Sequence, residues 1–169
     1  LSRKRREDEP WTEAVGEAVR RGARRYGAYF AHLGVIVTFV AIAVSSSYQT
    51  AQEGTLRPGE SMTVAGYKLT FERVEARPEP HRISDRARMR IEHNGKDAGT
   101  LEPALNRYDT RMEPIGTPAV RTAISHDLYL SLMNVGTDGS IGMRAIVTPA
   151  VVWIWIGVFI IVAGTAICL

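Results

Sequence analysis

Two long runs without a charged side chain constrain this chain more than any other feature. The first covers residues 26–52 and the second covers residues 145–169. A helix rises about 1.5 Å per residue, so roughly 20 apolar residues cross a hydrocarbon core of about 30 Å. Both runs are long enough. The pattern excludes an ordinary water-soluble globule and predicts a membrane α + β protein, in which two transmembrane helices flank an inserted domain.

Basic residues predict the direction of crossing. Four arginines between residues 20 and 25 directly precede the first run, and positive charge beside a span favours retention in the cytoplasm. A cleaved signal peptide is the competing interpretation, but its apolar part is usually 7–15 residues long, so we favour a retained span. The expected organisation is a charged cytoplasmic segment (1–25), a transmembrane helix (26–48), an extracytoplasmic domain (52–147) and a second transmembrane helix (149–169).

The charge balance indicates what the ends of the chain contact. The insert has 13 basic and 13 acidic residues, so the net charge of +3 comes from residues 1–25. This segment is expected to be an interfacial amphipathic helix or a solvated linker, with membrane lipid rather than nucleic acid as its partner. The chain begins at Leu1 and ends within an apolar run. We therefore expect a piece of a longer membrane protein.

The insert is predicted to be a small antiparallel β domain, either an open barrel or a sandwich. Apolar residues alternate with polar ones over residues 67–72, 87–92 and 128–132, which is the period of a half-buried strand. Asn94-Gly95 predicts a type I′ hairpin turn. The run 82–90 is expected to be a solvated strand face. Residues 102–122 contain three prolines, and we expect a loop there.

Small residues recur at steps of four and three along the first run, which on a helix forms a continuous seam. They are Gly27, Ala31, Gly34, Thr38, Ala41 and Ser45. Such a seam lets another helix approach closely. Gly157 and Gly164, seven residues apart in the second run, give a weaker sign of the same packing.

His32 is the one ionisable side chain deep in either run, apart from tyrosines near the ends. An ionisable residue inside a membrane is a candidate functional residue. Three interpretations stay open: an axial ligand of haem iron, a hydrogen bond between helices, or a side chain that snorkels to the interface. His81, His93 and His126 lack ligand spacing and are expected to be surface or strand residues.

Other chemistry finds little support in the sequence. The single Cys168 is expected to pack as a small apolar side chain, and no Cys-x-x-Cys-His motif is present. We find no pattern typical of a hydrolase or of a phosphate loop.

The order of these features resembles the C-terminal portion of CcmF-type cytochrome c biogenesis proteins. The resemblance covers about residues 26–169. It is carried by AHLGVIVTFVAIAVSSSYQT, LRPGESMTVAGYKLTFERVEA, DLYLSL and TPAVVWIWIGVFIIVAGTAICL. His-Leu-Gly and Trp-Ile-Trp are the most specific parts.

The resemblance implies a subunit of a haem lyase in the bacterial inner membrane, with the β domain in the periplasm. His32 matches a transmembrane histidine that binds haem b, a cofactor shared with the upstream part of the full-length protein. The family takes haem from the chaperone CcmE and attaches it to apocytochrome c, together with CcmH/CcmI-type subunits. Its Trp-rich haem-handling segment lies outside this chain, so whether this chain is itself catalytic stays open.

Two alternatives remain beside the general haem lyase. One is a membrane-anchored extracytoplasmic interaction module without a cofactor. The other is a nitrite-reductase-specific paralogue of the same family.

Overall fold

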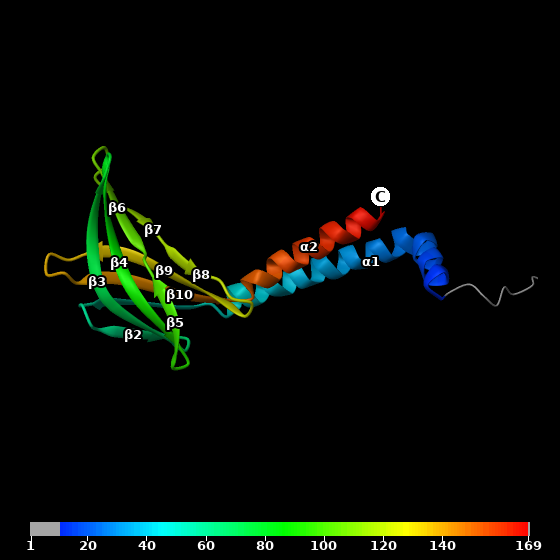
Figure 1. The fold of residues 1–169 in the computed structure, drawn as a ribbon, viewed down its shortest axis with the longest axis horizontal. Coiled ribbons are helices and arrows are strands. Elements are labelled where there is room, and N and C mark those ends of the chain that lie inside the picture. The colour runs from blue at the N-terminus through cyan, green and yellow to red at the C-terminus, as the bar shows by residue number, and fades with distance from the viewer. Residues whose placement is uncertain (1–10, 169) are drawn as a thin grey trace, which may run out of the picture. The chain divides into compact units, whose positions relative to one another are not determined.

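The computed structural model describes residues 11–168, with side chains from residue 22 onward. The chain divides into two compact units, shown in Figure 1. The helical unit contains the first helix up to Ile42 and the second helix from Trp153. The β unit runs from Ala43 to Val152. We describe each unit by itself.

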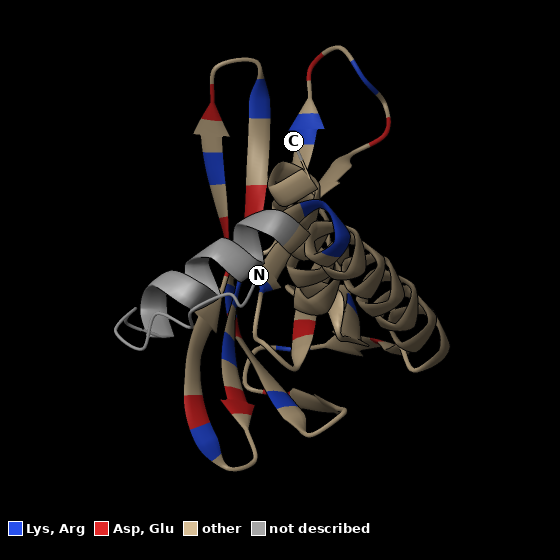
Figure 2. Cartoon of the chain, turned by 90° about the vertical axis from the view of Figure 1, so that its right-hand side faces the viewer, with Lys and Arg blue, Asp and Glu red and all other residues tan. Residues whose placement is uncertain are grey.

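The helical unit consists of α1 (Trp11–Ser47) and α2 (Val151–Cys168). Gly22–Ser47 and Val151–Cys168 are both long and apolar enough to span a membrane, as expected. Arg24 and Arg25 are the last charged residues of α1, and beyond them Figure 2 shows charged residues on the strands and their loops. The part of residues 1–25 before Trp11 lies outside the described residues.

Glycines allow the backbones of α1 and α2 to touch. A Cβ atom built on Gly34 would lie 2.7 Å from the carbonyl oxygen of Gly157, and one built on Gly164 would lie 2.5 Å from the amide nitrogen of Ala31. Gly27 likewise faces Gly164. The small-residue seam predicted on α1 is therefore confirmed as a helix-packing surface, and its partner is the second apolar helix of the same chain.

The β unit is an antiparallel β domain, as predicted, made of two facing sheets, one of them curved as a half-barrel. Sheet A has the strand order β1 (Thr50–Leu56), β10 (Ile141–Pro149), β9 (His126–Val135), β8 (Ala119–Arg121). Sheet B has the order β2 (Ser61–Val64), β3 (Tyr67–Glu79), β4 (Arg82–His93), β6 (Ala104–Tyr108), β7 (Ile115–Thr117), and β5 (Lys96–Leu101) also pairs with β4.

The core lies between the sheets and follows the alternation seen in the sequence. Its most deeply buried apolar side chains are Leu69, Phe71, Met89, Ile91, Leu128, Leu130, Leu132, Ile141 and Met143. A bulge between Phe71 and Arg73 shifts the pairing of β3 with β4 by one residue. Beyond it, Val74 takes over the inward position because side chains alternate across a strand.

The predicted turn at Asn94-Gly95 is confirmed. It joins β4 to β5, and its two residues have φ angles of 51° and 77°, as a type I′ turn requires.

The loop expected over residues 102–122 is wrong, because this stretch contains β6, β7 and β8. Ala104, Leu105 and Asn106 of β6 are buried in succession, so the strand shows no period of two. The three prolines (Pro103, Pro114 and Pro118) each stand immediately before a strand. A missing N–H at that position removes no hydrogen bond from the ladder. Prolines here mark strand starts rather than a loop.

The glycine contact leads to a test of the helical hairpin. Gly157→Ala would place a methyl group against Thr38 Oγ1 and 2.9 Å from the Gly34 carbonyl oxygen. Because backbone atoms cannot yield without separating the helices, we expect a loss of about 1–3 kcal/mol, measured by denaturant unfolding of the chain in detergent micelles. Ala163→Val, on the exposed face of α2, adds more volume and should change stability little. Equal effects from both variants would contradict the contact.

Candidate functional site

His32 lies on the side of α1 that does not face α2. The seam residues Gly34 and Ala41 are buried, and Gly34 faces Gly157 of α2, whereas the His32 side chain is exposed. Its Nδ1 atom is 2.7 Å from the carbonyl oxygen of Ala28, one turn earlier. This hydrogen bond stays within α1, so among the described residues His32 is not bonded to α2.

The hydrogen bond to Ala28 fixes the tautomer of His32. A carbonyl oxygen only accepts, so Nδ1 carries the proton and donates it, and Nε2 keeps a free lone pair. A histidine that ligates a metal commonly has its other nitrogen bound to a backbone carbonyl in this way. The geometry therefore leaves His32 able to donate one bond to a metal.

The neighbours of His32 along α1 are apolar, aromatic or small. Tyr29 and Ile36, three residues before and four after, are exposed apolar or aromatic side chains, and Ala28 is small. Within the described parts of α1 and α2, His32 is the only histidine, and the described residues hold no cluster of three or more His, Cys, Asp or Glu that suits a metal ion. The described residues alone therefore do not form a complete metal centre.

A polar cluster joins the two sheets of the β domain. Tyr67 of β3 and His126 of β9 form a hydrogen bond of 2.8 Å between the phenol oxygen and Nε2. The ring of His93 lies 4.2 Å from that of Tyr67 and 5.2 Å from that of His126, measured between centroids. Ser125 Oγ is 2.7 Å from His126 Nδ1. The cluster is therefore a polar link between the two sheets.

From the sequence we expect His93 and His126 to be separate surface or strand residues. The contact between their rings was not predicted. His93 is the register partner of Tyr67 across β3 and β4, so correct pairing of that long hairpin would have brought those two together. His126 belongs to the other sheet, and no local sequence pattern predicts its contact with Tyr67. His81 lies in the turn between β3 and β4 with a φ angle of 69°, at the opposite end of the hairpin.

Burial determines the ionisation of the Tyr67 phenol. Burial of the Tyr67 phenol raises its pKa above the ordinary value, an effect that Asp127 reinforces and Arg121 partly offsets. The phenol is therefore neutral at physiological pH and acts as a hydrogen-bonding group rather than as a nucleophile.

The outward side chains of β3 and β4 form what we call the charged face. It consists of Lys68, Glu72, Arg73, Glu75, Arg77, Glu79, Arg82, Arg86, Arg88, Arg90 and Glu92. Glu72, Glu75 and Glu79 each contact two arginines. The solvated strand face predicted for the charge run is confirmed. Exposed ion pairs contribute little to stability, so this face matters for its surface charge.

The architecture defines a class of protein: a β-sandwich domain inserted between two apolar helices that form a hairpin. The family described as "CcmF C-terminal beta-sandwich" matches residues 47–149, and the chain belongs to this family. It is part of a CcmF-type cytochrome c haem lyase.

Relatives and a solved structure agree with this assignment. The chain is 32% identical over 132 residues to the cytochrome c-type biogenesis protein CcmF of Pseudomonas fluorescens, covering 78% of this chain and 20% of that protein. It is 29% identical over 163 residues to CcmF of Escherichia coli, covering 92% and 25%.

A solved structure of "Cytochrome c Heme Lyase CcmF" superimposes with a TM-score of 0.73 at 25% identity, over 89% of this chain and 25% of that one. The chain thus spans about a fifth to a quarter of the length of these proteins.

The link between the sheets is open to test. Tyr67→Phe removes the phenol hydroxyl and leaves His126 Nε2 without its partner, so we expect a loss of about 1 kcal/mol in the free energy of unfolding. Chemical denaturation of the chain in micelles, followed by near-UV circular dichroism, measures it. Tyr129→Phe makes the same change at a half-buried tyrosine of β9 and should have a smaller effect. The hydrogen bond is contradicted if the two variants behave alike.

The raised pKa of Tyr67 also predicts a pH dependence. The unfolded phenol ionises near pH 10, whereas the folded phenol keeps its proton to higher pH. The neutral phenol therefore contributes its full share of stability below the unfolded pKa. This contribution is lost as pH rises through the folded pKa. Alkaline unfolding of the wild type should accordingly be steeper than that of Tyr67→Phe. Parallel curves would show that Tyr67 titrates normally.

Proposed function

We propose that His32 provides one axial bond to a haem b within the CcmF-type haem lyase to which this chain belongs. The observation that carries the proposal is the hydrogen bond from Nδ1 to the Ala28 carbonyl oxygen, which leaves Nε2 free. The exposure of the ring on the side away from α2 supports it. The second axial ligand would come from another part of the full-length protein.

The residues of this chain would perform four tasks for such a cofactor. His32 would hold the iron through Nε2, and the Ala28 carbonyl would keep the imidazole in a fixed orientation. Gly34, two residues further on, contacts α2 and would keep α1 from shifting. Apolar neighbours would exclude water. When bound, haem b would supply a one-electron iron centre whose potential depends on its axial ligands.

The wider role follows from the family. We propose that the assembled protein takes haem from the chaperone CcmE and attaches it to apocytochrome c in the bacterial inner membrane, with CcmH/CcmI-type subunits. Two helices able to span a membrane support this location. The β domain would lie in the periplasm and serve docking rather than chemistry. Within the described residues its polar groups form structural links and ion pairs.

Replacing the proposed ligand tests the assignment. His32→Ala in the full-length protein should abolish the b-type absorption of the purified protein, because one axial nitrogen is lost. Membrane insertion and yield should be unchanged. Val40→Ala, two turns further along α1 and also exposed, is the matched control and should retain the absorption.

A rescue experiment separates ligation from a structural role. Added imidazole should restore the absorption of His32→Ala, because the small ligand can occupy the space that the side chain leaves. Unchanged haem content in His32→Ala would discard the ligand assignment, and a wild-type protein that carries no haem would favour the interaction module without a cofactor. Lost haem without rescue would indicate that His32 acts through packing.

A further inference from the structure

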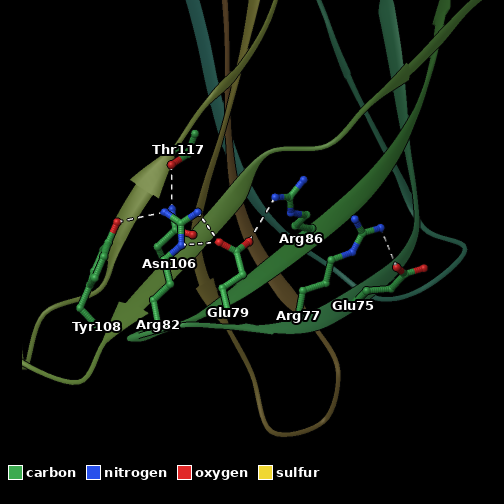
Figure 3. Close-up of polar contacts among 8 residues, drawn as sticks. All are labelled: Glu75, Arg77, Glu79, Arg82, Arg86, Asn106, Tyr108 and Thr117. Atoms are coloured by element: carbon green, nitrogen blue, oxygen red, sulfur yellow. Dashed lines mark hydrogen bonds and ion pairs between the residues drawn. The ribbon is translucent and has the colours of Figure 1, made fainter.

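The charged face has a distinct group of residues near the turn between β3 and β4. Ser84 lies between Arg82 and Arg86 along β4 and faces the same way, and its register partner on β3 is Arg77. Figure 3 shows the side chains of Arg77, Arg82 and Arg86 on one side of the sheet. We call Arg77, Arg82, Ser84 and Arg86 the arginine cluster.

Two buried polar atoms of the arginine cluster lack partners. The Ser84 side chain is 1% exposed, and neither its Oγ nor the Nε of Arg86 has a hydrogen-bond partner among the described residues. A buried polar group without a partner costs free energy, so such groups are uncommon. Both atoms can donate a hydrogen bond.

The carboxylates already present do not neutralise this part of the face. Glu79 is shared between Arg82 and Arg86, and Glu75 between Arg73 and Arg77. Arginine hydrogen bonds lower the pKa of both carboxyls, so both are charged. Four guanidinium groups thus share two carboxylates.

The three arginines of the arginine cluster are not held equally. Arg82 bonds Glu79 and also donates to the Tyr108 hydroxyl at 3.2 Å, so its position is fixed (Figure 3). Arg77 has one contact of 3.3 Å to Glu75, and Arg86 has one of 3.5 Å to Glu79. Arg77 and Arg86 therefore have donors to spare, on either side of Ser84.

We propose that the arginine cluster binds a carboxylate side chain from an acidic segment of a partner protein. Guanidinium groups bind carboxylates through charge-assisted hydrogen bonds, and the carboxylate oxygens would accept from Arg77, Arg86 and Ser84. Arg86, Arg88 and Arg90 continue the charge along β4 at every second residue. That spacing suits an extended acidic peptide, whose side chains alternate with the same period.

The position of the cluster favours a protein partner over anionic lipid. The other end of the β3–β4 hairpin holds Tyr67, which bonds His126, and His126 pairs with Pro149 shortly before α2 begins. The arginine cluster is therefore at the end of the hairpin away from the chain ends that lead into the apolar helices. The proposal does not depend on haem binding by His32.

Binding of a defined acidic peptide tests this proposal. The probe is fluorescein-labelled hexaglutamate, measured by fluorescence anisotropy with the full chain in uncharged detergent at low salt. We expect Arg77→Gln combined with Arg86→Gln to weaken binding about tenfold, a loss typical of charge-assisted hydrogen bonds. Lys68→Gln combined with Arg90→Gln removes the same charge further along the face and should weaken binding about twofold. Circular dichroism checks the fold of each variant.

Ser84→Ala supplies a test that leaves the charge unchanged. We expect binding to weaken about threefold through the lost hydroxyl. Thermal stability should hold or rise, because the variant removes a buried hydroxyl without a partner. A lower melting temperature with unchanged binding would show that Ser84 only packs.

Three results would overturn the proposal. They are no binding of hexaglutamate by the wild-type chain, equal weakening by both double variants, and binding to phosphatidylglycerol vesicles, but not to the peptide, that depends on Arg77 and Arg86. The last would assign the cluster to lipid.

Discussion

The close approach of α1 and α2 is the contact on which the rest of the chain depends. Two apolar helices gain no hydrophobic driving force from each other inside lipid, so they associate through van der Waals contact between backbones. Gly27 and Gly34 against Gly157 and Gly164 allow that contact. The hairpin they form supplies two adjacent chain ends. The β domain likewise has adjacent chain ends, because its first and last strands, β1 and β10, are neighbours in sheet A.

The two proposed binding groups, His32 and the arginine cluster, lie outside the apolar contacts between helices and between sheets, whereas Tyr67 is part of the core. His32 is on the side of α1 that does not contact α2. Tyr67, His93 and His126 meet where the two sheets come together at one end of the domain, and Arg77 and Arg86 project from the outer surface of sheet B near the other end. The apolar surfaces of helix and sheet hold the fold, and the polar side chains on the remaining surfaces are available for ligands or partners.

The candidate site was only partly predictable from the sequence. His32 stood out because an ionisable residue is costly inside an apolar run. The tautomer of His32 could not be predicted, because it depends on whether the Ala28 carbonyl or a group on another helix accepts the Nδ1 proton. The cluster of Tyr67, His93 and His126 was missed altogether. Tyr67 and His126 are 59 residues apart and come from different sheets, so only the packing of those sheets brings them together.

The sequence by itself determined the two apolar helices, the seam on α1, the alternating strands and the turn at Asn94-Gly95, because each depends on residues near one another along the chain. Only the tertiary structure decided that residues 104–121 contain three strands, since β6 pairs with β4, β7 with β6 and β8 with β9, and none of the three shows a local period. It also decided that α2 packs against the seam and that Ser84 Oγ is buried without a hydrogen-bond partner. Those outcomes depend on contacts between distant segments, which local propensity does not encode.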